Sequence, residues 1–319
     1  MTDAPIKREY DPANLDAPTL GVIELQNATK RFGKKTAFEN VSFSIAPGSV
    51  FALLGENGAG KTTTIRLLLG EMEPTSGQVR VFQNNPFDHV LENRARIGFV
   101  PETPVLYDYM TVAEIGKFAS AFYPEGYMAE YVKRCEEFGL APDDKIKSIS
   151  KGMRAKTSLA LALAHDPELL ILDEPTSGLD ALVRRGFLAN IADFAAVGKT
   201  VFLSSHQTAE VERVADRVAF LKDEKLIVNE PLDSLKETSQ TVVATILGSN
   251  AQDDSLQTLF ASVFDKLVGV ERYGARYRFL GRGLVKNFEE RIRVALGERL
   301  TEISVVQPNL EEIFIAYMN

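Results

Sequence analysis

Between Gly21 and about residue 236, short apolar runs alternate with longer segments in which apolar residues recur every three or four positions. This alternation predicts an α/β domain in which helices cover a largely parallel sheet. The run Leu169-Leu170-Ile171-Leu172 is apolar on both faces, as expected of a central parallel strand. We predict strands at residues 22–25, 41–45, 50–54, 79–82, 97–100, 169–172, 200–203 and 218–221, and helices at residues 61–69, 112–122, 128–138, 154–164, 182–195 and 208–215.

Two segments interrupt this rhythm. Residues 1–20 carry prolines and charges without a sustained period, which predicts a flexible N-terminal extension. Residues 92–150 are mostly of helical pattern, which predicts a helical insertion in the first domain. That domain is therefore expected to span residues 21–238.

Residues 239–319 show a second pattern, in the order β-α-β-β-α-β. This order predicts a small α+β domain of the ferredoxin-like, split βαβ type. A last helix is expected after Asn309, a favourable N-cap, and its apolar face either packs on its own domain or contacts a partner or a second copy. The predicted strands are residues 242–247, 268–273, 276–280 and 300–306, the predicted helices are residues 254–260 and 284–295, and the apolar face consists of Leu310, Ile313, Phe314 and Tyr317.

Composition narrows the class of protein. The chain has 319 residues, a formal net charge of −8 and 45% hydrophobic residues, which fits a globular protein of about two domains. The single cysteine, Cys135, excludes an internal disulfide, fits a reducing compartment and is expected to be a packing residue. No apolar stretch is long enough for a membrane helix, the N-terminus lacks the apolar core of a signal peptide, and the acidic balance disfavours nucleic acid. We therefore expect a cytosolic protein with no direct membrane insertion and no nucleic-acid partner.

The strongest local motif is Gly55-Glu56-Asn57-Gly58-Ala59-Gly60-Lys61-Thr62, which matches the phosphate-binding pattern G-x-x-x-x-G-K-[ST] between a predicted strand and a predicted helix. Glycines let backbone N–H groups turn toward a phosphate, where a Cβ would block close approach. Lys61 is expected to bring a charge to the β- and γ-phosphates, and Thr62 a hydroxyl to Mg²⁺. The predicted nucleotide-binding residues of this loop are Gly55, Asn57, Gly58, Ala59, Gly60, Lys61, Thr62 and Thr63.

Two carboxylates follow the apolar run at residues 169–172. An aspartate at the end of a buried strand beside a phosphate loop is suited to hold Mg²⁺, so Asp173 is a predicted metal ligand. Glu174 next to it is a candidate to polarise an attacking water. An apolar strand that ends in Asp-Glu is by itself weak evidence for a catalytic site, and the phosphate-loop motif makes that evidence strong.

From about Val22 to Lys236 the chain resembles the ATP-binding subunits of ABC transporters, because several motifs occur in the order of that family. The phosphate loop matches Walker A, and Leu169 to Glu174 match Walker B with its adjacent glutamate. Phe32 stands where the family stacks an aromatic ring on adenine. The other matches are Ile149-Ser150-Lys151-Gly152-Met153 with the signature L-S-G-G-Q, Ser177-Gly178-Leu179-Asp180 with the D-loop, and Ser204-Ser205-His206 with the switch histidine.

The resemblance implies a mechanism that uses ATP and Mg²⁺. Two such domains pair head to tail, as a homodimer or a heterodimer, and ATP lies between the phosphate loop of one and the signature of the other. His206 would contact the γ-phosphate and help hold the water near Glu174, while Asp180 would support the site of the partner. The signature residues that would meet the ATP of the partner are Ser150, Lys151, Gly152 and Met153.

Three positions depart from the family pattern. Glu102 stands where the family has Gln in a loop that touches Mg²⁺ and the permease, so it is either a metal ligand in a slower ATPase or a tolerated variant. In the signature, Lys151 replaces the first Gly and Met153 replaces Gln. The Lys151 side chain either points to water, which is the interpretation we prefer, or adds positive charge near phosphate. Ser-Lys-Gly-Met is similar to the branch that works with separately encoded membrane subunits, many of them exporters.

Residues 103–114 are unusually apolar for a loop. In the family the groove at this place receives a short helix of the membrane subunit, so the segment is expected to be either a docking site or insertion core. His89 and His165 are expected to be structural, with His165 favouring positive charge at a helix end.

These features predict the ATP-hydrolysing subunit of an ABC transporter, which powers translocation, and export rather than import, through a separate permease. That permease would attach the subunit peripherally to the inner face of the cell membrane. The alternative is a soluble ABC-type ATPase with a regulatory role outside transport. The residues after 238 carry no catalytic constellation, so we expect an accessory domain there.

Overall fold

The computed structural model describes residues 21–247 and 254–319, and the predicted extension at residues 1–20 lies outside them. Packing divides the chain into two units, Met1–Asn229 and Glu230–Asn319, each with a hydrophobic core. This division lies before the predicted boundary at residue 238. The difference arises because α8 (Leu232–Thr238) packs against β10 (Ser239–Ile246) and so belongs to the second unit.

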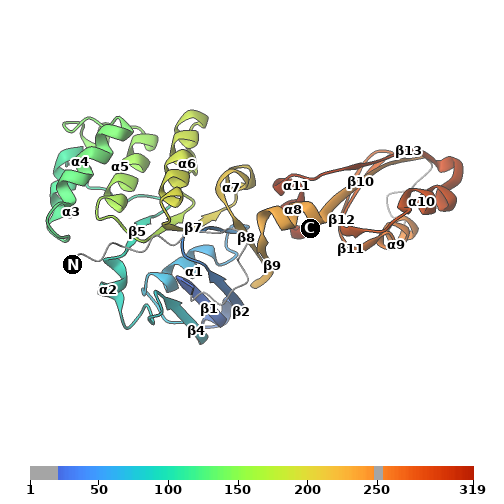
Figure 1. The fold of residues 1–319 in the computed structure, drawn as a ribbon, viewed down its shortest axis with the longest axis horizontal. Coiled ribbons are helices and arrows are strands. Elements are labelled where there is room, and N and C mark those ends of the chain that lie inside the picture. Colours follow the sequence, from blue (N-terminus) through green and yellow to red (C-terminus); the bar gives the residue numbers. More distant parts are fainter. Residues whose placement is uncertain (1–20, 248–253) are drawn as a thin grey trace, which may run out of the picture. The chain divides into compact units, whose positions relative to one another are not determined.

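A six-stranded sheet forms the centre of the first unit (Figure 1). All residues of its central strands are buried, which explains why these strands are apolar on both faces. The five strands from β5 to β8 in this order are parallel, so β3, β6 and β7 end at one edge. The strand order is β5 (Ile97–Val100), β6 (Leu169–Asp173), β7 (Thr200–Ser205), β3 (Val50–Gly55), β8 (Arg217–Lys222) and β9 (Lys225–Pro231).

A second, antiparallel sheet has the order β2 (Lys35–Ile45), β1 (Ile23–Phe32) and β4 (Ser76–Val81). It shares a core with the first sheet, because the rings of Phe43 and Phe51 stack with centroids 4.9 Å apart. β1 and β2 extend well beyond the predicted strands, since their outer halves mix exposed and buried residues and show no apolar run. The longer hairpin carries Phe32 to its tip.

The helices of the first unit follow the strands. Figure 1 shows α3, α4 and α5 lying together as one helical group. The predicted insertion at residues 92–150 is therefore displaced along the chain: β5 belongs to the sheet, and α5 belongs to the helical group. The helices are α1 (Lys61–Leu68), α2 (Val90–Arg94), α3 (Val112–Ser120), α4 (Tyr127–Phe138), the 3₁₀ helix η1 (Ile146–Ser148), α5 (Lys151–Leu163), α6 (Ala181–Ala196) and α7 (Thr208–Val214).

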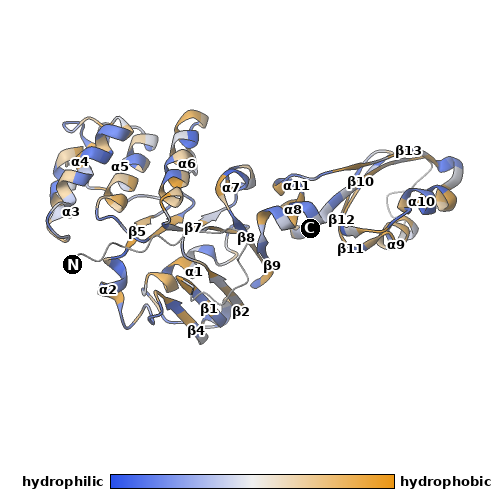
Figure 2. Ribbon diagram, in the orientation of Figure 1, coloured by the Kyte–Doolittle hydropathy of each residue, from blue (hydrophilic) through white to orange (hydrophobic). Residues whose placement is uncertain are grey.

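Tyr131 holds the helical group together. α4 carries hydrophobic and hydrophilic residues on different stripes (Figure 2), and Tyr131 lies on its buried stripe. The Tyr131 hydroxyl donates a hydrogen bond of 2.8 Å to the carbonyl of Val112. The ring packs on Gly116 of α3, where a Cβ would lie 2.1 Å from a ring carbon. Glycine is therefore needed at position 116 to let α3 and α4 approach.

The second unit is a four-stranded antiparallel sheet in the order β11 (Phe264–Tyr273), β12 (Arg276–Leu284), β10 and β13 (Leu300–Val306). Its core includes buried side chains of α9 (Asp254–Ala261) and α10 (Phe288–Leu296). α10 begins later than predicted, since Leu284 ends β12. A short 3₁₀ helix, η2 (Gly297–Arg299), precedes β13.

The last helix, α11 (Leu310–Met318), packs on β11. Leu310 and Ile313 are fully buried, and Ala316 lies so close to Gly269 that a Cβ there would be 2.8 Å from the Ala316 Cβ. The prediction that the apolar face of this helix packs on its own domain is confirmed.

Candidate functional site

The loop between β3 and α1 is packed tightly against neighbouring strands. Gly58 and Gly60 have φ angles of 85° and 107°, which favour glycine. A Cβ at Gly60 would lie 2.6 Å from the carbonyl oxygen of Ala37, and a Cβ at Gly55 would lie 2.7 Å from that of Leu221. The glycines thus satisfy both conformation and packing, and they bring the N-terminal N–H groups of α1 to the sheet edge.

Lys61, the first residue of α1, is buried at 6% exposure. Its ammonium donates to the carbonyl oxygen of Gly55 at 2.6 Å and to that of Glu56 at 3.3 Å. It also lies 3.0 Å from Oε1 of Glu174. The carbonyl oxygens of the loop and the Glu174 carboxylate together hold the positive charge of Lys61.

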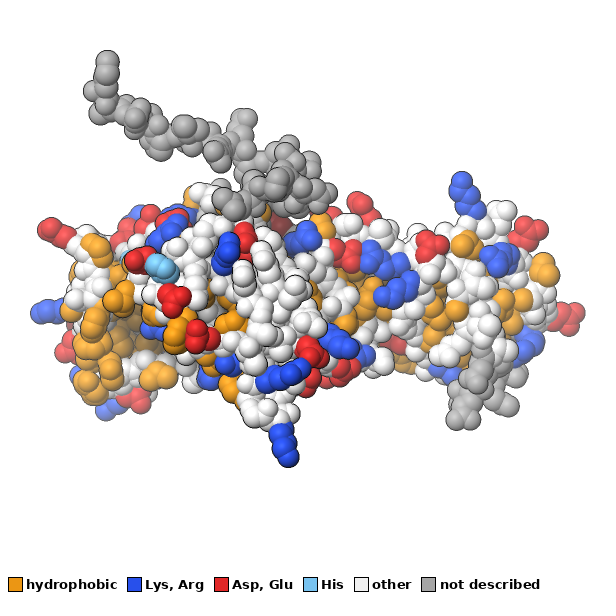
Figure 3. Space-filling view, turned by 90° about the horizontal axis from the view of Figure 1, so that it is seen from below, with side chains coloured by type: hydrophobic (Ala, Val, Ile, Leu, Met, Phe, Trp, Pro, Cys, Tyr) orange, Lys and Arg blue, Asp and Glu red, His pale blue; other side chains and the backbone are white. Residues whose placement is uncertain are grey.

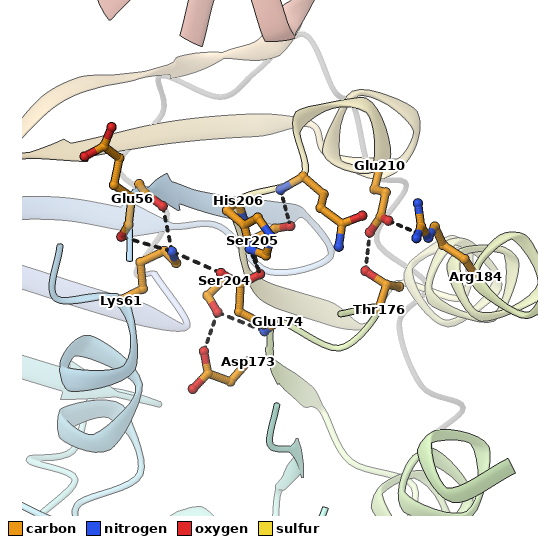
Figure 4. A network of polar contacts seen from close by, with 12 residues as sticks. Glu56, Lys61, Asp173, Glu174, Thr176, Arg184, Ser204, Ser205, His206 and Glu210 are labelled. Carbon is orange, nitrogen blue, oxygen red and sulfur yellow. Dashed lines mark hydrogen bonds and ion pairs between the residues drawn. The ribbon is translucent and has the colours of Figure 1, made fainter. Parts of the chain in front are cut away.

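Asp173 and Glu174 are both buried at the end of β6. The hydroxyl of Ser204, which is paired with Asp173 across β6 and β7, donates to Oδ1 of Asp173 at 2.5 Å. The backbone N–H of Glu174 points back to the Ser204 hydroxyl at 3.2 Å (Figure 4). Glu174 has a φ of 46°, so the chain turns sharply here and separates the two carboxylates.

His206 is bonded to Glu174 twice. Oε2 of Glu174 accepts from the backbone N–H of His206 at 3.2 Å and lies 2.7 Å from its Nδ1. Oε1 accepts no hydrogen bond of good geometry from the described residues, although the Lys61 ammonium is near it. The His206 side chain is 45% exposed, so one buried carboxylate links the buried lysine to an accessible imidazole.

A cavity of about 750 Å³ opens over these side chains. Phe32 and Lys35 of the β1–β2 hairpin line this cavity, and so do Glu174 and His206. Phe32 is 48% exposed, and the Lys30 ammonium lies 5.2 Å from its ring centroid. The other lining residues are Ala37, Glu56, Asn57, Gly58, Gly60, Lys61, Thr62, Thr63, Glu102 and Ser177.

The structure therefore brings most of the predicted nucleotide-binding residues into one cavity. Gly55, Ala59 and Asp173 do not line it. Gly55 and Asp173 are the last residues of β3 and β6 and so lie at the same sheet edge. Ser150, Lys151, Gly152, Met153 and Asp180 are also not among its lining residues.

Ser150 and Asp180 cap helices. The Ser150 side chain accepts from the N–H of Met153 at 3.2 Å at the start of α5. Asp180 accepts from Leu182 and Val183 at the start of α6, at 3.1 and 2.9 Å. Capping a helix does not prevent a role toward a second subunit, since Ser150 and Asp180 are both exposed.

Lys151 lies against the segment that leads to Asp180. Lys151 is exposed, as expected of a side chain that points to water, and its ammonium lies 2.4 Å from where a Cβ at Gly178 would be. Lys151 also lines a smaller cavity of about 270 Å³ together with Arg154, Ser177 and Glu102. Glu102 and Ser177 border this cavity as well as the larger one. The two charged residues that differ from the family pattern, Glu102 and Lys151, therefore both lie beside the nucleotide cavity.

The donor set fits a magnesium nucleotide. Mg²⁺ prefers oxygen ligands and is usually held by one or two carboxylates together with substrate phosphates. Asp173 and the Thr62 hydroxyl are oxygen donors placed at the ends of β6 and of the phosphate loop. Among the described residues there is no group of three or more His, Cys, Asp or Glu side chains suited to a metal. The protein therefore fits a metal that arrives with phosphates better than a metal held by the protein alone.

Several residues of the site were not predicted from the sequence. Lys35 and Glu56 line the cavity, and Ser204 holds Asp173. Lys35 is the cross-strand partner of Phe32, so recognising the hairpin would have identified it. Ser204 is two residues before His206, but its bond to Asp173 depends on β6 and β7 being neighbours.

The remaining candidates are structural. The His165 ring stacks on Tyr123, and burial lowers the pKa of His165, which opposes the cationic tendency expected at this helix end. His165 Nε2 lies 3.0 Å from the carbonyl oxygen of Ile97. His89 pairs with Glu92 on the surface at 3.0 Å. Cys135 is buried, as predicted for a packing residue, and burial raises the pKa of its thiol.

A second accessible region lies on the helical group. A cavity of about 450 Å³ there is lined by residues of the 103–106 segment and by Tyr123, Tyr127 and His165. Beside it lies an aromatic patch, and Figure 3 shows hydrophobic side chains gathered at the end of the first unit that carries α3. The aromatic patch consists of Val105, Tyr107, Tyr109, Phe118 and Phe122, all exposed, with Tyr109 68% exposed.

The chain is similar to proteins of one family over most of its length. A family model described as ABC transporter matches residues 38–177. The bacitracin transport ATP-binding protein BcrA of Bacillus licheniformis is 31% identical over 92% of this chain and 96% of that protein. The Nod factor export ATP-binding protein I of Sinorhizobium fredii is 32% identical over 92% of this chain and 84% of that protein.

Solved structures agree with the sequence comparisons. A structure of the ATP binding subunit of an ABC transporter matches with a TM-score of 0.63 and 30% identity, covering 68% of this chain and 92% of that chain. Within the described residues, no helix is both long and apolar enough to cross a membrane.

Proposed function

The chain belongs to the family of ABC transporter ATP-binding proteins, and from this premise we propose that its ATP hydrolysis drives export through a separate membrane permease. It is an ATP hydrolase with an ABC-type P-loop fold. The observation that carries the proposal is the cavity in which the phosphate loop, Lys61, Glu174 and His206 meet.

In the proposed site, the phosphates of ATP lie on the loop and at the start of α1, with the Lys61 ammonium on the β- and γ-phosphates. Phe32 stacks on the adenine, which its exposure in the lining of the cavity supports. Asn57, Thr63 and the glycines complete the contacts of the loop.

Glu174 acts as the general base for the attacking water. Oε2 is occupied by the two bonds from His206, which orient the imidazole. Oε1 faces the Lys61 ammonium at 3.0 Å and becomes the oxygen suited to receive a proton when phosphates draw that ammonium away. His206 also contacts the γ-phosphate, which its exposed ring supports.

Thr62 and Asp173 hold Mg²⁺ in this proposal, and Glu102 is a further ligand. Mg²⁺ neutralises charge on the phosphates when it is bound. Ser204 fixes Asp173 by its hydrogen bond and so orients the carboxylate from the neighbouring strand.

The signature residues act on a second subunit. The signature residues Ser150, Lys151, Gly152 and Met153 stand at the start of α5 and are not among the lining residues of the nucleotide cavity, which supports a role toward the nucleotide of another subunit. We therefore infer an ATP-dependent dimer, with the same chain or a related one, in which Asp180 reaches the site of the partner. Loss of the γ-phosphate weakens this dimer.

A short helix of the permease occupies the 450 Å³ cavity and the aromatic patch. Exposed aromatic rings that contact one another support this assignment, since Tyr107 and Phe118 are 5.4 Å apart and neither is buried. Export is supported by relatives whose names describe Nod factor and fluoroquinolone export. The chain then attaches to the inner face of the membrane through the permease.

The second unit is assigned to the ferredoxin-like class, supported by its βαββαβ order and its antiparallel strand order. We assign it an accessory role, since its sequence carries no catalytic constellation.

The test is to combine the full chain with the membrane protein encoded beside its gene and to measure ATP hydrolysis in vesicles. We expect the permease to raise the rate. Tyr109→Ser should keep the basal rate and lose this stimulation, whereas Val294→Ser, at an 81% exposed position on α10, should keep both. A Tyr109→Ser chain that is stimulated normally would contradict docking at the aromatic patch.

A further inference from the structure

Glu210 is a buried carboxylate that the proposed chemistry does not use. It lies on α7, four residues after His206, and is 6% exposed. The Thr176 hydroxyl donates to its Oε2, and Nε of Arg184 lies 2.9 Å from its Oε1 (Figure 4). Glu210 does not line the nucleotide cavity.

The two partners of Glu210 come from functionally different segments. Thr176 is two residues after Glu174, in the turn that leaves β6. Arg184 lies on α6, and its Nη2 donates to the carbonyl oxygen of Leu179 at 2.9 Å, next to Asp180. One carboxylate therefore connects the turn after Glu174, the segment at Asp180 and the helix after His206.

Burying the Glu210 carboxylate costs free energy. Desolvation raises the pKa of Glu210, even though Thr176 and Arg184 both oppose that effect. Apolar side chains of similar size would fill such a place at lower cost, so the charged group gives geometric specificity and no gain in stability. The Glu210 carboxylate has both of its oxygens paired only when Thr176 and Arg184 are both in place, so these contacts fix the relative positions of the two segments.

We propose that Glu210 is a positioning residue for hydrolysis: it holds the Asp180 segment in register with Glu174 and His206, so that engagement of a partner at Asp180 and activation of water occur together. The inference rests on the proposed roles of Glu174, His206 and Asp180. Since Glu210 touches neither the nucleotide cavity nor the phosphate loop, its loss should reduce kcat and leave ATP binding unchanged.

The experiment is a double-mutant cycle on the full chain with Glu210→Gln, Arg184→Gln and the double variant. We measure kcat and KM for ATP hydrolysis and the affinity for a fluorescent ATP analogue. Each single variant should lower kcat by about tenfold to a hundredfold, since small misplacements of reacting groups have effects of this size. KM and analogue affinity should change less than about twofold, and the double variant should be no slower than the singles, because the two residues act as a unit.

Glu168→Gln is the matched control. It removes a carboxylate that makes an equally close ion pair, with Arg96 at 2.7 Å, at the opposite end of the strands from the site. It should leave kcat and KM as in the wild type.

Three results would overturn the inference: a wild-type kcat in Glu210→Gln, a parallel loss of nucleotide binding, or additive effects in the double variant. Glu174→Gln serves to separate the two proposals. If Glu174→Gln still hydrolyses ATP at the wild-type rate, the proposed function of the site fails. If Glu174→Gln is inactive and Glu210→Gln is fully active, only the positioning role fails.

Discussion

The ammonium of Lys61 lies 3.0 Å from Oε1 of Glu174, and both side chains are buried. The lysine of the phosphate-loop motif and the proposed general base thus form a buried ion pair. In the proposed mechanism, phosphates that attract the Lys61 ammonium would weaken this pair and free Oε1 of Glu174 to accept a proton. Nucleotide binding would thereby be coupled to the readiness of the base through a single ammonium group.

Lys61→Met should destabilise the nucleotide-free protein. The substitution leaves the Glu174 carboxylate buried without its cation, and breaking a buried pair from one side costs about 3 kcal/mol. Urea unfolding monitored by circular dichroism gives the free energy of unfolding. The double variant Lys61→Met/Glu174→Gln should recover most of this loss, since it leaves no unpaired charge. A double variant as unstable as Lys61→Met alone would show that the pair has no energetic role.

Glu102→Gln should speed hydrolysis at saturating Mg²⁺ and lower the affinity for Mg²⁺. Glu102 lines the nucleotide cavity, where an added negative charge opposes the phosphates by on the order of 1 kcal/mol, or about fivefold in rate. Its carboxylate is also a better Mg²⁺ ligand than an amide, so half-saturation should require more Mg²⁺ in the variant. Phosphate release measured across a Mg²⁺ titration tests both effects. An unchanged rate and an unchanged titration would mean that Glu102 is only a tolerated variant.

Gly116→Ala should destabilise the helical group. The added Cβ would lie 2.1 Å from a carbon of the Tyr131 ring, and Tyr131 is held by its hydroxyl bond to Val112. Overpacking of this kind costs about 1–3 kcal/mol. Gly186→Ala on α6 is the control, because a Cβ there meets no atom within 4 Å. We expect that substitution to raise the free energy of unfolding by up to about 1 kcal/mol, and equal effects of the two substitutions on urea midpoints would contradict the packing argument.

Stability should fall as the pH is lowered through the range of an unperturbed histidine. Burial lowers the pKa of His165 in the folded chain, so below about pH 6.5 the unfolded chain takes up the proton first and is favoured. Above that pH, His165 makes its full contribution to the free energy of unfolding. Each unit of difference between the folded and unfolded pKa values corresponds to about 1.4 kcal/mol. His165→Gln should have a flatter dependence of Tm on pH than the wild type. His89→Gln, at an exposed ring, should keep the wild-type slope, and an identical slope in all three proteins would refute the role of His165.

Local pattern was sufficient for much of the site. β6 is apolar on both faces and was predicted almost to the residue, and the glycines of the phosphate loop are dictated by backbone angles and contacts at Gly55, Gly58 and Gly60. The chemistry of the loop and of Asp173 and Glu174 depends on residue types that stand next to each other in the chain. Such features can be predicted without knowledge of the tertiary structure.

Other features depend on contacts between distant segments, and the sequence alone could not predict them. Glu210 looks like an ordinary surface residue of a short helix, and its partner Thr176 is 34 positions away. Lys151 is exposed, as expected, but the closeness of its ammonium to Gly178 depends on the starts of α5 and α6 being neighbours. The outer halves of β1 and β2 have mixed polarity and are strands because they pair with each other.

The most direct test of the account is the oligomeric state of the Glu174→Gln chain with ATP and Mg²⁺, measured by size-exclusion chromatography with light scattering. The variant should bind ATP without hydrolysing it, so the sandwich of phosphate loop and signature should persist. We expect a dimer with ATP and a monomer with ADP or without nucleotide. Ser150→Arg, placed at the start of α5, should bind ATP equally well and stay monomeric in the same background. A Glu174→Gln chain that remains monomeric with saturating ATP would contradict the proposed mechanism.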